Sequence, residues 1–329
     1  MKVTAKASVR KSGSPEVRKS SGSRIALPPP TSSNANDAQK RQKSAHATLP
    51  DFRTSGLPDP AANRITRRFA ELRADGKKAF VAYICAGDPN LDATVELVVA
   101  MAAAGVDVIE LGIPFTDPMA DGPANQAACE RALASGTTVR GVLDAVRRIR
   151  ARSDVPLLFF TYLNPVLAYG VERFASDAVA AGVDGLLPLD LPPEEGPEFL
   201  AAMQAFGLAT VCLSAPTTPL ARKKLLMQAT RGFLYYVCRL GVTGERAELP
   251  ADLAQQVGAL KKVADAPVCI GFGISSPEQA ALAAALGDGV IVGSHLVRMI
   301  EKHGASPDLV RLVAGRAGEL AAAVHAVAT

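Results

Sequence analysis

The sequence predicts an α/β fold, a single (β/α)8 barrel of the TIM type over residues 63–329, with an added N-terminal helix and a disordered tail over residues 1–62. Two observations support this fold. Short apolar runs alternate with helical stretches rich in alanine, leucine and charged residues, which is typical of βα units around a parallel sheet. One module of helix end, glycine, aspartate and strand recurs at residues 102–114, 178–192 and 283–294, which favours a closed eightfold barrel.

The N-terminal tail, residues 1–62, is rich in Ser, Lys, Arg, Pro and Ala and poor in large apolar side chains. Such a segment buries too little apolar surface to offset the chain entropy lost on folding, so we expect it to be disordered. It lacks the apolar segment of a secretory signal. Positions 1–60 hold 11 basic and 4 acidic residues, a net charge of +7 within a chain total of +4. The remainder is therefore mildly acidic, and nothing indicates a nucleic-acid surface.

The folded part begins with an expected helix over residues 65–74, and strands and helices then alternate. The strands are apolar on both faces, as a parallel sheet covered by helices requires. A doubly wound open sheet is the alternative, but no G-x-G-x-x-G motif follows the first strand. The expected strands cover residues 79–85, 106–111, 156–161, 185–189, 209–213, 233–238, 267–270 and 289–292.

Cysteine usage and hydropathy narrow the class of protein further. No apolar run approaches the roughly 20 residues that a membrane-spanning helix needs. Four of the five cysteines lie in strand-like runs and no C-x-x-C spacing occurs, so we expect reduced, buried thiols, with a single reactive cysteine as the alternative. The cysteines are Cys85, Cys129, Cys212, Cys238 and Cys269.

The segment IELGIPFTDPMADGP, residues 109–123, places two carboxylates near the end of the second strand. Side chains alternate along a strand, so Glu110 is expected to share a face with Val106 and Val108. If that face points into the barrel, burial raises the pKa of Glu110 and lets it carry a proton near neutral pH. A structural carboxylate bonded to backbone amides is the alternative. Asp121 is either the partner carboxylate or the N-cap of the helix that begins near Pro123.

Glycine-rich turns follow the last three strands, at residues 239–245, 271–275 and 293–297. Backbone amides and a helix N-terminus at this position form an anion site, and loops after the last two strands are the usual phosphate location in such a barrel. The set predicts phosphate binding, with simple turn formation as the alternative. The turn after the first strand, residues 86–90, fits a structural and a functional reading equally well.

The placement of lysine and histidine argues against two other chemistries. No lysine lies at the carboxyl end of an expected strand, which disfavours a Schiff-base aldolase. The histidines show no metal-ligand spacing, and His295 is expected in the first turn of a helix, which disfavours a metal-dependent lyase. Acid/base chemistry on a phosphorylated molecule remains.

Residues 109–123 closely resemble the signature of the tryptophan synthase alpha subunit family. The similarity continues through FVAYICAGDP, LLFFTYLNPV, RLGVTG, GFGIS and VGS, and it covers the chain from about Arg64 to its end. The resemblance implies a lyase that cleaves indole-3-glycerol phosphate to indole and glyceraldehyde 3-phosphate in L-tryptophan biosynthesis. It also implies that the chain uses no cofactor and that pyridoxal phosphate belongs only to a tryptophan synthase beta subunit, the expected partner in an alpha2beta2 heterotetramer.

The resemblance also implies roles for residues that match the motifs of the family. Glu110 is the expected general acid and base, and Asp121 is the expected partner carboxylate. The expected substrate-binding residues are Tyr83, Phe160, Tyr162, Leu187, Tyr235 and Thr243. The expected phosphate-binding residues are Gly244, Phe272, Gly273, Gly293 and Ser294.

The sequence departs from the family pattern at several positions. Thr116 replaces the commoner serine, Tyr83 adds a hydroxyl where phenylalanine is familiar, and Asn125 stands where an apolar residue is often found, which makes the pocket wall more polar. The loop after Gly244 is short. A stand-alone lyase that releases free indole, and an inactive barrel that only binds a partner, remain as alternatives. We expect a cytoplasmic protein, although the tail composition also suits a plastid transit peptide.

Overall fold

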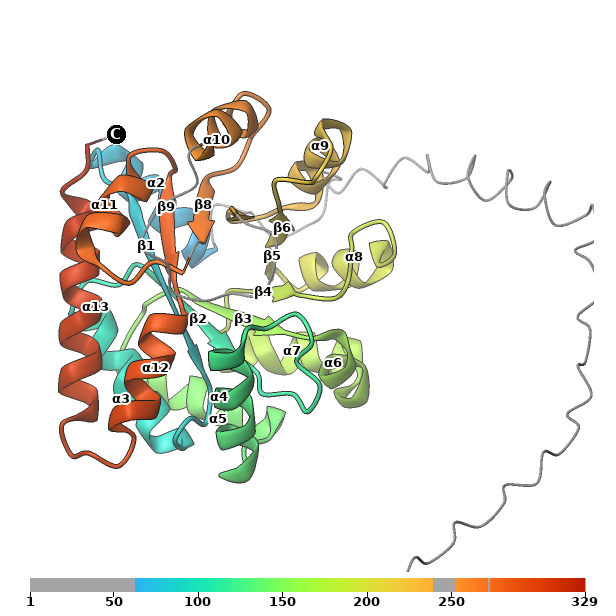
Figure 1. Cartoon of the computed structure of the whole chain (residues 1–329). Helices are drawn as coiled ribbons and strands as arrows, with labels where there is room; N and C mark the ends of the chain where they lie inside the picture. Colours follow the sequence, from blue (N-terminus) through green and yellow to red (C-terminus); the bar gives the residue numbers. More distant parts are fainter. Residues whose placement is uncertain (1–62, 239–251, 272, 329) are drawn as a thin grey trace, which may run out of the picture. The chain divides into compact units, whose positions relative to one another are not determined.

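The computed structural model describes residues 63–238, 252–271 and 273–328, so the tail expected over residues 1–62 lies outside it. Strands lie at the centre of the described part and helices surround them (Figure 1). The strands are β1 (Ala79–Cys85), β2 (Val108–Gly112), β3 (Leu157–Thr161), β4 (Gly185–Pro188), β5 (Ala209–Thr210), β6 (Cys212–Ser214), β7 (Leu234–Val237), β8 (Val268–Gly271) and β9 (Gly289–Val292). The helices are α2 (Arg64–Ala74), α3 (Leu91–Ala103), α4 (Pro123–Ala134), α5 (Val139–Arg150), α6 (Leu163–Tyr169), α7 (Val171–Ala181), α8 (Pro197–Ala205), α9 (Leu220–Ala229), α10 (Leu253–Lys261), α11 (Pro277–Ala284), α12 (Ser294–His303) and α13 (Leu309–His325).

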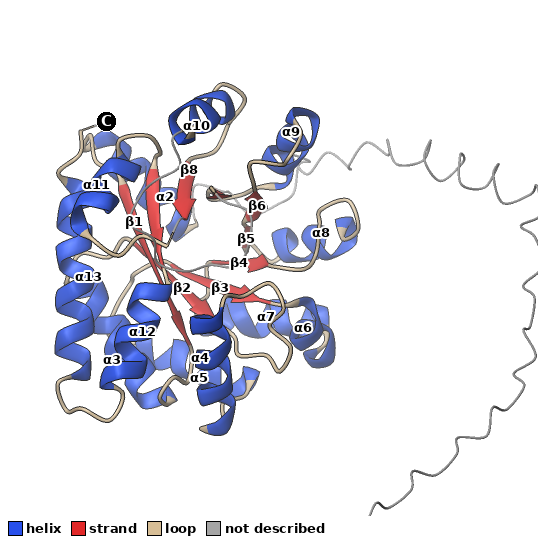
Figure 2. Cartoon of the chain, viewed as in Figure 1, coloured by secondary structure: helices blue, strands red, loops and turns tan. Residues whose placement is uncertain are grey.

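The strands pair in parallel in the order β5-β4-β3-β2-β1-β9-β8-β7-β6, and the helices lie outside this sheet (Figure 2). The first and last members of this order, β5 and β6, are separated only by Val211 and together form the strand expected over residues 209–213. Because β5 pairs with β4 and β6 pairs with β7, this divided strand closes the sheet into a barrel. The predicted (β/α)8 barrel is confirmed, and the open-sheet alternative is wrong.

Alternate residues of each strand face the two sides of the barrel wall. One set packs outward against the helices, and the other fills the interior together with three side chains of α2, Ile65, Phe69 and Leu72. The ring of Phe69 lies 5.5 Å from that of Phe233, which directly precedes β7. The amphipathic helix α2 therefore closes the amino-terminal end of the barrel interior. The strand residues of the interior set include Val81, Val108, Leu158, Leu187, Cys269 and Ile291.

The expected start of the second strand needs one correction. Val106 precedes β2 and packs in the outer cluster, so it does not share a face with Val108 as the alternation pattern suggested. Asp107 contacts Phe80 through both its backbone and its side chain: its amide donates to the carbonyl of Phe80 at 3.0 Å, and its Oδ2 accepts from the amide of Phe80 at 2.7 Å. Because a carboxylate and not a backbone carbonyl accepts from Phe80, the regular pairing of β2 with β1 begins only at Val108.

The recurrent aspartates of the helix–glycine–strand modules share this role. Asp184 accepts from the amide of Leu157 at 2.8 Å, and Asp288 accepts from the amide of Val268 at 2.9 Å. Each aspartate thus joins the start of its own strand to the start of the preceding one. Basic side chains balance the charges: Arg68 on Asp107, Arg150 on Asp184 and Lys261 on Asp288.

Replacing Asp184 with alanine is expected to lower the free energy of unfolding by about 3 kcal/mol. The substitution removes the ion pairs of Asp184 with Arg64 and Arg150 and the hydrogen bond from the amide of Leu157. Urea denaturation measures this loss. Asp154→Ala is the matched control, since that aspartate side chain is 90% exposed and lies 3.8 Å from Arg64. Its expected effect is below about 0.5 kcal/mol. Equal losses in the two variants would contradict a role for the buried contacts.

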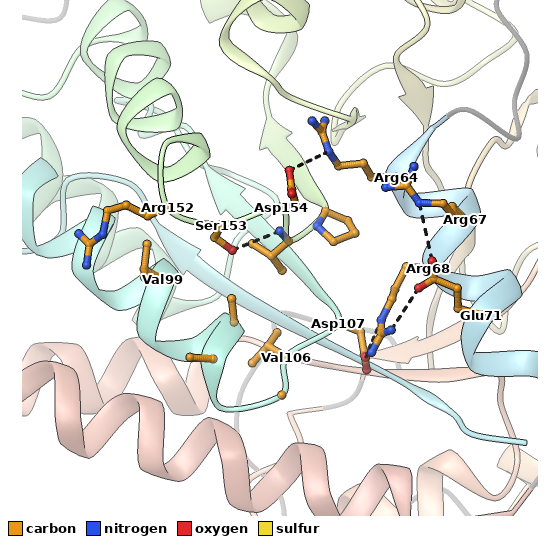
Figure 3. Close-up of a pocket in the computed structure, with 15 residues that line it drawn as sticks. Arg64, Arg67, Arg68, Glu71, Val99, Val106, Asp107, Arg152, Ser153 and Asp154 are labelled. Atoms are coloured by element: carbon orange, nitrogen blue, oxygen red, sulfur yellow. Dashed lines mark hydrogen bonds and ion pairs between the residues drawn. The ribbon is translucent and has the colours of Figure 1, made fainter. Parts of the chain in front are cut away.

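A pocket of about 490 Å³ opens beside these ion pairs, between α2, the end of α3 and the segment before β3. Figure 3 shows Arg68 directed toward Asp107, and Arg64 directed toward Asp154. None of the site residues expected from the sequence lines this pocket. It lies at the amino ends of the strands, which in this fold is the end opposite the usual active site.

Two further expectations concern cysteines and membranes. All five cysteines are buried and none of them forms a disulfide bond, as expected for reduced thiols. Within the described ranges, no helix has the length and apolar character needed to cross a bilayer.

Candidate active site

Glu110 lies in the middle of β2 and is completely buried. Its strand neighbours in register are Tyr83 of β1 and Leu158 of β3. Neither carboxylate oxygen has a hydrogen-bond partner among the described residues, so the alternative of a carboxylate held by backbone amides is wrong. Burial raises the pKa of Glu110 to about 8. This side chain therefore carries a proton at neutral pH and titrates close to it.

Glu110 is expected to make the stability of the protein fall as the pH rises. The folded pKa of about 8 lies above the ordinary 4.5, so the folded state holds a proton that the unfolded chain has released between these values. The stabilisation is complete below pH 4.5 and is lost as the pH rises through about 8. Glu110→Gln removes this titration, so its stability relative to the parent is expected to increase by a few kcal/mol across this window.

Urea unfolding of both proteins at pH 5.5, 7 and 8.5 measures this dependence. Glu195→Gln is the matched control, because Glu195 is exposed and its replacement should leave the pH dependence unchanged. A difference between Glu110→Gln and the parent that stays constant with pH would contradict a buried, protonated Glu110.

Asp121 lies in the loop between β2 and α4 and is buried. The phenol of Tyr162 donates to its Oδ2 at 2.9 Å, and the amide group of Asn125 donates to its Oδ1 at 3.1 Å. Burial raises the pKa of Asp121, and these two hydrogen bonds oppose that rise. The N-cap of α4 is Gly122 and makes no side-chain cap bond, so the N-cap alternative for Asp121 is wrong.

Tyr162 also connects Asp121 to the loop backbone. Its hydroxyl accepts from the amide of Ala120 at 3.0 Å while it donates to Asp121. Its ring lies 5.3 Å from that of Phe115. The carboxylate and the loop that carries it are therefore held by one side chain from the end of β3.

The expected substrate-binding residues Tyr83, Phe160, Leu187 and Tyr235 come from β1, β3, β4 and β7. Leu187 belongs to the interior cluster, and Phe160 and Tyr235 pack against it. Tyr83 belongs to a neighbouring cluster with residues of α4 and α12, and Phe160 packs against that cluster too. The rings of Tyr83 and Phe160 lie 4.8 Å apart. Burial raises the pKa of both Tyr83 and Tyr235, and Glu110 and Asp121 add to the rise at each phenol. The two carboxyl groups thus act on the same pair of phenols, which places them around a common region.

Glycines on adjacent strands make room for these tyrosines. A Cβ atom at Gly112 would lie 2.5 Å from the hydroxyl of Tyr83, and a Cβ at Gly271 would lie 2.5 Å from the ring of Tyr235. On the other side of Tyr83, a Cβ at Gly293 would approach its ring to 3.1 Å. These strand ends therefore require glycine because bulky rings occupy the space above them.

Part of the expected phosphate site lies in the described residues. Gly273 follows β8 with a φ of 67°, a left-handed conformation that favours glycine. Gly293 is the N-cap of α12, and Ser294 is its first residue. Because β8 and β9 pair, these two turns are neighbours at the carboxyl end of the barrel. Thr243, Gly244 and Phe272 lie outside the described residues.

The turn after β1 has a structural role. Asp88 is buried and forms a two-point ion pair with Arg131 of α4, at 2.9 and 2.8 Å. Asn90 caps α3 by accepting from the amide of Ala93.

His295 lies in the first turn of α12, as expected. In the described part of the chain, no group of three or more metal-ligating side chains is gathered.

Asn125 is the residue whose place in the site the sequence did not reveal. The sequence indicates only a more polar pocket wall at this position, whereas in the structure Asn125 contacts the carboxylate of Asp121. The available signal in the sequence was the spacing of four residues between Asp121 and Asn125, because residues four apart at the start of a helix share a face. The path of the loop before α4 decides whether the side chains meet, and that path is not encoded in the spacing.

Comparisons with known proteins agree on one family. A family model described as tryptophan synthase alpha chain matches residues 69–325. A tryptophan synthase alpha chain from Geobacter sulfurreducens is 50% identical over 240 residues, which cover 73% of this chain and 91% of that protein. One from Laribacter hongkongensis is 51% identical over 256 residues, covering 77% and 97%. The crystal structure of the alpha chain from Legionella pneumophila has a TM-score of 0.73 at 39% identity, covering 80% of this chain and 97% of that one.

Proposed function

Because the chain belongs to the tryptophan synthase alpha chain family, we propose that Glu110 and Asp121 are the two carboxyl groups that carry out its lyase reaction. The reaction is cleavage of indole-3-glycerol phosphate to indole and glyceraldehyde 3-phosphate, a carbon–carbon bond cleavage in L-tryptophan biosynthesis. The observation that carries the assignment of Glu110 is its complete burial without a partner, with a pKa of about 8.

Glu110 acts first as an acid and then as a base. Its carboxyl group delivers a proton to C3 of the indole ring, which moves positive charge onto the ring nitrogen. The resulting carboxylate takes the proton of the hydroxyl on the adjoining glycerol carbon. The electrons of that O–H bond form the aldehyde carbonyl as the carbon–carbon bond breaks, and the electrons of the broken bond restore the aromatic ring. A pKa close to the working pH suits both transfers.

Asp121 stabilises the charge that develops on the ring nitrogen by accepting the indole N–H. Its two existing hydrogen bonds, from Tyr162 and Asn125, engage one oxygen each and leave lone pairs for the substrate. The ring is proposed to lie against Tyr83, Phe160, Leu187 and Tyr235. The polar end of the substrate is proposed to bind Gly273, Gly293 and Ser294 together with Thr243, Gly244 and Phe272.

The proposed partner is a tryptophan synthase beta subunit, in an alpha2beta2 heterotetramer. The loop between β2 and α4 is the proposed contact, because Met119 there is 86% exposed. The same loop carries Asp121, so a partner seated on it would act directly on the proposed site. The alpha chain is proposed to work without a cofactor of its own, and pyridoxal phosphate is assigned to the beta partner.

Release of indole from indole-3-glycerol phosphate tests the function, measured with the full chain alone and with a beta subunit. We expect slow cleavage by the chain alone and faster cleavage in a complex. Cleavage without any complex or rate change would favour a stand-alone lyase. Absence of cleavage under both conditions would contradict the assignment and favour an inactive barrel.

Residues 1–62 are proposed to lie outside the catalytic unit, because the family match begins only at residue 69. Deleting residues 1–60 is therefore expected to leave the kcat for indole release within about twofold of the parent. Loss of folding in the truncated chain, seen by circular dichroism, would contradict this boundary. The cytoplasm is the proposed location, and import of a fusion of residues 1–62 into plastids would support the alternative.

A further inference from the structure

Asn125 occupies an unusual position for an amide side chain. It is the third residue of α4 and is 6% exposed, and its Oδ1 has no hydrogen-bond partner among the described residues. Its Nδ2 makes one hydrogen bond, to Oδ1 of Asp121 at 3.1 Å. Burying an amide with an unsatisfied oxygen is unfavourable, and an apolar residue would suit this place in the fold better. The hydrogen bond to Asp121 is the favourable interaction that the amide makes at this position.

The surroundings of Asp121 explain why such a donor matters. Burial works against the ionised form of this carboxylate. The titratable groups among the described residues that interact with Asp121 are Tyr83 and Cys85 of β1, Cys129 of α4, Tyr162 at the start of α6 and Tyr235 of β7. All of them are phenols or thiols and none is cationic. The ionised form of Asp121 therefore depends on hydrogen-bond donors.

We propose that Asn125 is a positioning residue for catalysis, which fixes the Asp121 carboxylate against the Tyr162 hydroxyl and keeps it ionised to receive the indole N–H. The inference rests on the proposed role of Asp121. Asn125 holds Oδ1 and Tyr162 holds Oδ2, so the carboxylate plane is set from two sides by α4 and by the end of β3. A single donor would leave the carboxylate free to rotate about its last bond.

Asn125→Leu tests the proposal, because leucine keeps the number and branching of the side-chain heavy atoms and removes the donor. In indole-release assays from pH 5.5 to 9, the acidic limb of the plot of kcat against pH is expected to shift to higher pH by about one unit. At the acidic end of this range kcat is expected to fall by up to about tenfold, with KM changed less than twofold. The melting temperature is expected to match or exceed that of the parent, since an unsatisfied buried amide has been removed. A purely structural role predicts the reverse, with lower stability and an unmoved acidic limb.

Gln126→Leu is the matched control. The neighbouring amide of Gln126 donates to the backbone carbonyl of Asp121 at 2.9 Å and does not contact its carboxylate. This variant is expected to leave the acidic limb in place, and an equal shift in both variants would overturn the proposal. Asn125→Ala gives the same readout if leucine prevents folding. An acidic limb and kcat equal to those of the parent in the folded Asn125 variant would also overturn it.

Asp121→Asn separates the two levels of inference. If Asp121→Asn retains the parent rate, the proposed role of Asp121 fails and Asn125 has no carboxylate to position. If Asp121→Asn is inactive while Asn125→Leu matches the parent, only the role of Asn125 fails.

Discussion

Glu110→Gln is expected to reduce kcat for indole release by 10³-fold or more while the protein stays folded. Each proton transfer by a positioned side chain contributes roughly 10²–10⁴ in rate, and Glu110 is proposed to perform two of them. Glutamine keeps the shape of the side chain and can neither deliver nor accept the proton. KM is expected to change little, because the proposed anchors of the substrate, the aromatic rings and the glycine turns, are untouched.

Steady-state measurement of indole release with the isolated chain gives this value without the partner. Glu130→Gln is the control, because Glu130 is an exposed glutamate on α4 and its replacement should leave kcat unchanged. Turnover within tenfold of the parent in Glu110→Gln would remove Glu110 from the mechanism. Loss of the folded state, monitored by circular dichroism, would instead show that its role is structural.

Asp121→Asn is expected to lower kcat by about 10²–10³, the typical loss when one preorganised group facing a developing charge is removed. The amide is nearly isosteric with the carboxylate and carries no negative charge to offset the positive ring nitrogen. Because the charge appears only in the transition state, the loss is expected in kcat with little change in KM.

Asp117→Asn provides the control for Asp121, because Asp117 is an exposed carboxylate in the same loop. Its bond from the hydroxyl of Thr116 remains within that loop. The control variant is expected to keep the parent rate in the isolated chain. An Asp121→Asn variant whose kcat stays within threefold of the parent would show that another group stabilises the ring nitrogen.

The barrel could be predicted from the sequence because its strands are buried on both faces and are separated by regular helices. β1 and β9 were expected with their observed bounds. Alternation predicted that Glu110 shares a face with Val108, and the structure places Val108 in the interior cluster. The division of the fifth strand at Val211 left no signal, since a continuous apolar run reads the same whether one or two neighbours pair with it.

The roles of polar side chains were harder to predict. The aspartates before β2, β4 and β9 were visible as a repeat, but their bonds to amides of the preceding strand depend on how neighbouring strands are staggered. Asp121 also fitted an N-cap in the sequence, because only the loop path places Gly122 at that position instead. The contact of Asn125 with Asp121 depends on the same path.

The three aspartates that tie strand starts together have a consequence for how this enzyme tolerates change. They set the alignment of neighbouring strands from the amino-terminal rim, far along each strand from the carboxyl-terminal loops. Substitutions in those loops can therefore alter which molecules are accepted without loosening the scaffold. The two ends can therefore be engineered separately, the amino-terminal rim for stability and the carboxyl-terminal loops for substrate specificity and catalysis.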